Sequence, residues 1–222
     1  MPEMQIYAGA VDKGLEGVVA CTTSVSSIQG ATLSYRGYAI EDLAAHATFE
    51  EVIFLLWNSR LPRKSELQEF CQSLQSQMKF PVGFLEALKA LPTEVHPMAW
   101  LRTAVSLLAH FDPDANDSST EAFHRKSLRL AAQMGPLVCA FEALRKKKPF
   151  VEPLAGKSIS WNFMRSLLGR DPDPEIVKVF DTCLILHADH ELNCSAFATR
   201  VTASSLSDLH SAIVSAIGAL KG

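Results

Sequence analysis

The stretch DPEIVKVFDTCLILHADHELNCSAF, residues 173–197, decides the fold class of this chain. Asp173 can cap a helix with its carboxylate. Pro174 suits the first helical turn, where the N–H group that proline lacks would have had no partner. A mostly apolar stretch follows, and we expect it to form the longest apolar helix of the chain, buried, beginning at Pro174 and continuing through the polar residues 187–193.

Similar start and stop signals mark helices along most of the chain. In the clearest, Thr48-Phe49-Glu50-Glu51, the threonine and the second glutamate can cap each other's backbone amides. Proline inside a helix removes a hydrogen bond, so a kink or a break is expected at Gly135-Pro136. Residues 112–120, DPDANDSST, are a polar surface loop. Two further helices are predicted to begin near Ser65 and at His96-Pro97. Four more are predicted to span about Val82 to Leu91, Glu121 to about Lys147, Ser160 to Leu168 and about Leu206 to Leu220.

The first forty residues differ from this helical pattern. Gly14, Gly17, Gly30 and Gly37 stand among many threonines, serines and valines, which indicates short strands and turns, with one turn at Gln29-Gly30. Roughly two-thirds of the chain is predicted to be helical, well above the usual share of about one-third. The predicted fold class is therefore all-α with a small N-terminal β-strand region.

Composition narrows the functional classes. Of the 222 residues, 48% are hydrophobic and 20% are charged, and the net charge is −3, which gives no electrostatic case for a nucleic acid or an anionic membrane as partner. The five cysteines are odd in number and scattered, as reduced thiols are. Neither a secretory signal nor a membrane-spanning run is recognisable, so we expect a soluble, cytoplasmic protein.

Residues 187–193 carry the most concentrated polar chemistry of the sequence. Two histidines, two carboxylates and an amide fall within seven residues of an otherwise apolar stretch. On a helix, His187, His190 and Glu191 would share one face, and His190 and Asn193 would also lie together. Because buried polar groups cost stability unless they are paired, the cluster has either mutual partners or a ligand. Both readings are open from the residues alone.

Metal binding and nucleophilic catalysis are the rival chemistries. Zinc-binding helices carry His-Glu-x-x-His or His-x-x-Glu-His, and the run from His187 to Glu191 matches neither pattern. No serine or cysteine lies in a recognisable nucleophile turn. We therefore expect no metal site and no covalent nucleophile.

Several motifs, in order along the whole chain, resemble one family. Besides LHADHELN at 186–193, they are GLEGVV at 14–19, LSYRGYAIEDL at 33–43, FEEV at 49–52, LP at 61–62, HPM at 96–98, LRTAVS at 101–106 and the run from Ser207 to Gly222. In sequence and spacing they resemble the citrate synthase family, specifically the short bacterial citrate and 2-methylcitrate synthases. The resemblance implies a Claisen-type condensation of acetyl-CoA or propionyl-CoA with oxaloacetate. Acyl-CoA is a substrate there, so no cofactor is expected.

The resemblance also assigns candidate site residues. His190 corresponds to a histidine that binds oxaloacetate, with Asn193 beside it and His187 as a supporting member of the cluster. Positioned imidazole and amide groups can orient the ketone and the two carboxylates of oxaloacetate. Tyr35, Arg36 and Tyr38 are also recognisable, and we interpret them as structural because a strand-like N-terminal region more often packs than catalyses. The remaining histidines (His46, His96, His110, His124 and His210) are predicted to be capping or surface residues.

The resemblance places the family's catalytic groups after the matched run. Its enolising histidine, its carbonyl-polarising histidine, its catalytic aspartate and the arginines that hold the carboxylates all correspond to positions beyond Gly222. Residues 1–222 are thus expected to form the N-terminal part of the large domain, with no catalytic residue, no turnover alone and much of a homodimer surface. The alternative is a non-catalytic helical dimerisation protein of the same fold.

Overall fold

A small antiparallel sheet opens the described part of the protein. The computed structural model describes residue 19 and residues 21–222. Strands β1 (Ser26–Gln29), β2 (Thr32–Tyr35) and β3 (Tyr38–Ala39) pair in sequence order, and Ser26 lies opposite Tyr35. Gly30, with φ of 62°, makes the predicted turn between β1 and β2. The strand and turn predicted around Gly14 and Gly17 lie outside the described residues.

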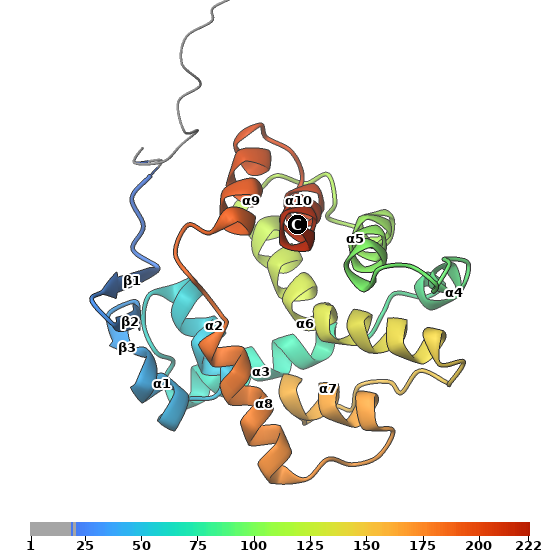
Figure 1. The fold of residues 1–222 in the computed structure, drawn as a ribbon, viewed down its shortest axis with the longest axis horizontal. Coiled ribbons are helices and arrows are strands. Elements are labelled where there is room, and N and C mark those ends of the chain that lie inside the picture. Colours follow the sequence, from blue (N-terminus) through green and yellow to red (C-terminus); the bar gives the residue numbers. More distant parts are fainter. Residues whose placement is uncertain (1–18, 20) are drawn as a thin grey trace, which may run out of the picture.

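The other regular elements of the described residues are helices, as Figure 1 shows. They are α1 (Ile40–His46), α2 (Phe49–Asn58), α3 (Lys64–Gln77), α4 (Phe84–Lys89), α5 (Pro97–Leu108), the 3₁₀ turn η1 (Ala109–Phe111), α6 (Thr120–Arg145), α7 (Ile159–Leu168), α8 (Pro174–Leu186), α9 (Cys194–Ser204) and α10 (Leu209–Lys221). The predicted class, all-α with a small N-terminal strand region, is confirmed.

The strongest local capping signals were read correctly. The Thr48 amide donates to Glu51 at 2.7 Å while the Glu51 amide donates to the Thr48 hydroxyl at 3.4 Å, which completes the predicted capping box. The Glu175 amide donates to Asp173 at 2.8 Å, so α8 begins where expected. The His96 imidazole accepts from the Met98 amide at 3.2 Å and thus caps α5.

Two helices begin one to three residues away from the predicted positions. Helix α3 begins at Lys64 rather than Ser65, because the Arg63 amide donates to Glu66 at 2.7 Å and makes Arg63 the capping residue. The last helix begins at Leu209 rather than near Leu206. Leu206 has a left-handed backbone, with φ of 63°, and Asp208 caps α10 instead.

Helix α6 contains Pro136 without breaking. The helix is continuous from Thr120 to Arg145, although its ribbon changes direction between the pale green first half and the yellow second half in Figure 1. A proline has no amide hydrogen to donate to the carbonyl of residue 132, which permits such a bend. The predicted kink is therefore present, and the predicted break is not.

The core has three centres. Helices α4, α5, α6 and α10 enclose the largest, around Phe84, Trp100 and Leu137. The second joins the sheet to α1, α2 and α8 around Tyr35 and Leu55, both of which have no exposed surface. The third joins α2, α3, α6 and α7. The second centre holds the sheet against the end of α8.

Helix α8 is not buried as predicted. Ile185 is its one buried residue, while Val179 is 65% exposed and Ile176 and Leu186 are also exposed. The helix packs against α1, α2 and α7 along one side. An apolar helix covered on one side only leaves apolar surface open to solvent or to a partner.

All five cysteines are free, as predicted. Within the described residues, none of the helices combines the length and the apolar character that a membrane crossing requires.

Candidate functional site

The residues singled out from the sequence lie in a loop rather than on a helix. Helix α8 ends at Leu186, His187 is its C-cap, and Asn193 is the N-cap of α9. We call residues 187–192 the α8–α9 loop. The predicted helix through this segment is wrong, and with it the shared helical face of His187, His190 and Glu191.

Local side chains and one distant tyrosine end the helix. The Asp189 carboxylate accepts from the Glu191 amide at 3.0 Å, a side-chain turn that competes with helical hydrogen bonding. Glu191 takes a left-handed backbone conformation, with φ of 53°. The Tyr35 hydroxyl meets the carbonyl oxygens of Ile185 at 3.1 Å and Asp189 at 3.0 Å. The chain therefore turns here instead of continuing as helix.

The sheet anchors this loop. The hydroxyl of Ser26, a buried residue of β1, donates to the Asp189 carboxylate, and the Glu191 amide donates to the Ser26 hydroxyl at 3.2 Å. The Ile28 amide donates to Glu191 Oε1 at 3.1 Å. Figure 1 shows the orange connection between α8 and α9 running beside the blue sheet. Strands more than 150 residues earlier thus fix the loop backbone.

The anchoring uses both carboxylates of the loop. Asp189 is held by Ser26, and Glu191 is held by Ile28, so both acidic side chains are engaged by β1. Burial raises the pKa of the nearby Tyr35 hydroxyl, which therefore stays protonated as a donor. The histidines are the polar side chains of the loop left for other contacts.

The two histidines differ in their freedom. His187 Nδ1 lies 2.7 Å from the Cys183 carbonyl oxygen, and because a carbonyl can only accept, Nδ1 carries the proton. In the neutral ring, Nε2 is then an acceptor. The exposed His190 ring has no hydrogen-bond partner among the described residues, so both of its nitrogens are available. His190 is the side chain of the loop most open to a ligand.

Asn193 has a structural task that the sequence did not reveal. Its side-chain oxygen accepts from the Ala196 amide at 2.9 Å and from the Ser195 hydroxyl at 2.6 Å, so it caps α9. The Asn193 amide nitrogen has no hydrogen-bond partner within the described residues. Its side chain can therefore cap the helix through oxygen and still donate through nitrogen.

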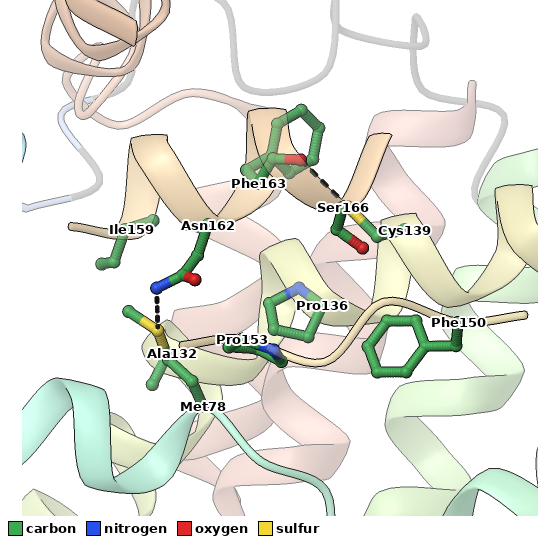
Figure 2. A pocket seen from close by; sticks show the side chains of 10 residues that line it. All are labelled: Met78, Ala132, Pro136, Cys139, Phe150, Pro153, Ile159, Asn162, Phe163 and Ser166. Carbon is green, nitrogen blue, oxygen red and sulfur yellow. Dashed lines mark hydrogen bonds between the residues drawn. The ribbon is translucent and has the colours of Figure 1, made fainter. Parts of the chain in front are cut away.

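The small pocket between α6 and α7 is not a substrate site. Figure 2 shows Met78, Pro136, Cys139 and Asn162 converging on it, and its volume of about 10 Å³ holds at most one water molecule. Burial raises the pKa of the Cys139 thiol to about 11, so this cysteine is not a reactive nucleophile.

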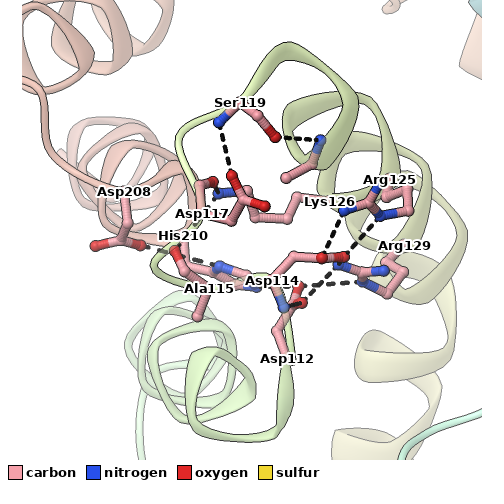
Figure 3. A network of polar contacts seen from close by, with 11 residues as sticks. Asp112, Asp114, Ala115, Asp117, Ser119, Arg125, Lys126, Arg129, Asp208 and His210 are labelled. Carbon is pink, nitrogen blue, oxygen red and sulfur yellow. Dashed lines mark hydrogen bonds and ion pairs between the residues drawn. The ribbon is translucent and has the colours of Figure 1, made fainter.

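A buried ionic cluster joins residues 112–117 to α6 and α10 (Figure 3). Arg129 meets Asp112 and Asp114 at 2.5 Å each, and Lys126 Nζ donates to the Asp117 carbonyl at 2.6 Å. This connection is a loop, as predicted, but it is not simply a surface loop, because the Asp112 side chain is only 3% exposed. The loop is instead tied firmly to α6.

His210 is neither a surface residue nor a capping residue, contrary to the prediction. It is 1% exposed, with Nε2 3.4 Å from Asp112 and Nδ1 3.9 Å from Asp208. Burial lowers the pKa of His210, with Lys126 and Arg129 acting in the same direction and the two aspartates opposing them. The imidazole is therefore mainly neutral and serves the packing of α10. The described residues gather no group of three metal-ligating side chains, and the absence of a metal site stays a prediction.

Comparisons with known proteins agree on one family. The family model described as "Citrate synthase, C-terminal domain" matches residues 14–222. The chain belongs to the citrate synthase family. Among curated relatives, citrate synthase 2 of Bacillus subtilis is 51% identical over 211 residues, which are 95% of this chain and 57% of that protein. A 2-methylcitrate synthase of Mycobacterium tuberculosis is 40% identical over 96% of this chain and 54% of its own length.

Solved citrate synthases share the fold of this chain. The enzyme from Pyrobaculum aerophilum superposes with a TM-score of 0.90 at 35% identity, over 99% of this chain and 57% of that one. The enzyme from Thermoplasma acidophilum, solved as a ternary complex with carboxymethyl-coenzyme A and oxaloacetate, gives 0.89 at 29% identity, over 96% of this chain and 56% of that one. The chain therefore spans somewhat more than half the length of these citrate synthases.

Sequence reasoning missed the residues that position the site. Ser26 gives no sequence signal, since it is one of two adjacent serines in the first strand. Tyr35 was correctly assigned a structural role, and so was Arg36, whose guanidinium donates to the Leu56 carbonyl at 2.8 Å. No hydrogen bond to the exposed Tyr38 hydroxyl is present in the described residues, so its role stays a prediction.

Proposed function

We propose that this chain supplies part of the oxaloacetate site of a citrate synthase-type enzyme, which condenses acetyl-CoA or propionyl-CoA with oxaloacetate. The observation that carries the proposal is the placement of His190. Its ring is exposed and has no hydrogen-bond partner among the described residues, on a loop that β1 and Tyr35 hold in place. A preorganised donor of this kind can orient a carbonyl or a carboxylate.

The chemistry of oxaloacetate fits the groups that the loop leaves free. The ligand presents a ketone and two carboxylates, all of them acceptors. His190 can donate from either nitrogen, and the Asn193 amide can donate from its free nitrogen. His187 can donate through Nε2 only when protonated, since Nδ1 serves Cys183, so its role is the supporting one. Both acidic side chains are turned to β1, which reduces repulsion of the dianion.

The same geometry argues that these residues do not catalyse the condensation by themselves. Removing a proton next to a thioester requires a positioned base and a donor for the developing enolate. Asp189 and Glu191 are the carboxylates nearest to the histidines in sequence, and both are already hydrogen-bonded to the sheet. We infer that residues 1–222 are the first part of the large domain and have no turnover alone. The homodimer and the cytoplasmic location stay predictions.

Binding measurements with paired histidine variants test the proposal. By calorimetry, oxaloacetate should bind the 222-residue chain weakly, with a Kd on the order of 1 mM, since the resemblance assigns the arginines that hold the carboxylates to positions beyond Gly222. His190→Ala should abolish binding, whereas His124→Ala, an exposed histidine on α6, should leave it unchanged. Equal binding by both variants, or micromolar affinity, would contradict the assignment. CoA release from acetyl-CoA and oxaloacetate above background would contradict the inferred lack of turnover.

A further inference from the structure

One ring nitrogen of the buried His210 has no hydrogen-bond partner among the described residues. The residue is 1% exposed and stands in the first turn of α10. Its Nε2 atom lies 3.4 Å from Asp112 Oδ2, and its Nδ1 atom, the one without a partner, lies 3.9 Å from Asp208 Oδ1. Figure 3 shows the ring between these two aspartates.

The two aspartates decide which ring nitrogen carries the proton. Asp112 is paired with the Arg129 guanidinium through both of its oxygens, at 3.1 and 2.5 Å, as a carboxylate is. A carboxylate can only accept, so the neutral His210 ring directs the N–H group of Nε2 toward Asp112. Nδ1 then holds a lone pair, and Asp208, the group that it faces, is also an acceptor. A buried acceptor without a donor costs stability.

The other charged groups around His210 do not supply the missing donor. On α6, the Lys126 ammonium donates to the Asp117 carbonyl at 2.6 Å, and two aspartates engage Arg129. Three further titratable or charged side chains stand on the remaining elements next to α10, all of them exposed: His110 on η1, Arg102 on α5 and Arg200 on α9. None of them donates to Nδ1. A proton taken up by Nδ1 is therefore the group that would give this atom a hydrogen bond, with Asp208 as acceptor.

Asp208 already has a task that such a bond would disturb. It caps α10, because its Oδ1 accepts from the Ser211 amide at 2.9 Å and its Oδ2 accepts from the Ser211 hydroxyl at 2.5 Å. A charged N–H···O bond is about 2.7–2.9 Å long, so Nδ1 and Oδ1 would have to approach by about 1 Å. The His210 ring is enclosed, whereas the Asp208 side chain is 32% exposed. The carboxylate is therefore the group that moves, and it moves away from Ser211.

We propose that His210 and Asp208 form a pH-sensitive switch at the start of α10. While Nδ1 is unprotonated, Asp208 caps the helix through Ser211. When Nδ1 takes up a proton, its N–H group draws the Asp208 carboxylate from the Ser211 amide to the imidazolium, and the first turn of α10 loses its cap.

The titration of both groups agrees with this order of events. Burial lowers the pKa of His210, with Lys126 and Arg129 acting in the same direction and the two aspartates opposing them, so the imidazolium forms only in acid. Burial raises the pKa of Asp208, but the hydrogen bonds from Ser211 and the charge of His210 outweigh it and leave that pKa below its usual value. Asp208 is thus still a carboxylate when the ring becomes charged.

NMR of the 222-residue chain between pH 7.5 and pH 4.5 tests the switch. At pH 7.5, the ring nitrogen shifts of His210 should show the neutral tautomer with hydrogen on Nε2. On acidification, the Ser211 amide signal should shift with the same midpoint as the ring. Solvent exchange of the Ser211 amide, corrected for its intrinsic pH dependence, should become about fivefold faster, the size expected for one lost cap. A ring that does not titrate in this range, hydrogen on Nδ1 at pH 7.5, or a Ser211 amide that does not follow the ring would overturn the proposal.

Three variants assign the change to this pair of residues. Asp208→Asn keeps an oxygen that can cap α10 but has no charge to attract an imidazolium, so Ser211 exchange should stay within about twofold over the same pH range. His210→Gln removes the titrating ring and should give the same result. His124→Gln, the matched control at an exposed histidine on α6, should behave like the wild type.

Circular dichroism checks that each variant keeps its helical content, and the wild-type titration decides the matter for any variant that does not. Exchange that accelerates in Asp208→Asn or His210→Gln as it does in the wild type would overturn the switch. Loss of the acceleration in His124→Gln would do the same, by assigning the pH dependence to another histidine. None of these measurements involves oxaloacetate, so their failure leaves the proposed function standing.

Discussion

Replacing Tyr35 with phenylalanine removes the one oxygen atom through which β2 holds the end of α8. That hydroxyl lies 3.1 Å from the Ile185 carbonyl and 3.0 Å from the Asp189 carbonyl, and it accepts from the Asp189 amide at 3.3 Å. The ring is fully buried and would keep its apolar contacts in Tyr35→Phe. The substitution therefore tests the hydrogen bonds without opening a cavity.

The structure sets the size of the effect. The Ile185 carbonyl keeps a second donor in the Ala188 amide, at 3.2 Å, whereas no other hydrogen bond to the Asp189 carbonyl is present within the described residues. One donated and one accepted bond are lost at a buried position, each contributing about 0.5–1.5 kcal/mol. We expect Tyr35→Phe to lower the free energy of unfolding by about 2 kcal/mol.

Urea unfolding followed by circular dichroism measures this difference, and Tyr38→Phe is the matched control. Tyr38 lies in the same sheet and is 40% exposed, with no hydroxyl hydrogen bond in the described residues. Its variant should stay within about 0.5 kcal/mol of the wild type. If Tyr35→Phe is as stable as Tyr38→Phe, then Tyr35 does not hold the α8–α9 loop and our account of its position is wrong.

Three further predictions concern other parts of the molecule. Burial lowers the pKa of His210 below its value in the unfolded chain, so the folded state binds fewer protons than the unfolded state. The free energy of unfolding should therefore be independent of this group well above pH 6.5 and should fall as the pH drops below 6.5. In thermal unfolding, His210→Gln should flatten this decline, and an unchanged pH profile would contradict the assignment. Asn193→Ala should cost about 1 kcal/mol in urea unfolding, because α9 loses its cap, and a neutral effect would refute that role. At pH 8, iodoacetamide followed by mass spectrometry should label the exposed Cys183 and spare Cys139, whose pKa is raised to about 11; the reverse order would contradict the burial.

Local physics explains which parts of the fold were predictable from the sequence. The starts of α2 and α8 were read correctly because Thr48 and Asp173 cap amides only two or three residues away. The turn at Gly30 was predictable because it needs a left-handed backbone. Such features depend on neighbours in the sequence and not on the rest of the fold.

The errors share a different cause. The end of α8 depends on Ser26 and Tyr35, more than 150 residues away, so the prediction wrongly extended this helix beyond Leu186. His210 is buried because Asp112, almost a hundred residues earlier, lies against it. No local pattern contains these contacts. The candidate site residues come from the resemblance to a family and not from their predicted helical spacing, which was wrong.

The most direct test of the central claim follows individual imidazole rings by NMR while oxaloacetate is added. We predict that the His190 signals shift saturably with a midpoint on the order of 1 mM, that the His187 signals shift less, and that the buried His210 and the distant His124 stay unchanged. Resonances of His190 that do not move while other sites respond, or that do not move at all, would contradict the proposal that this loop binds oxaloacetate.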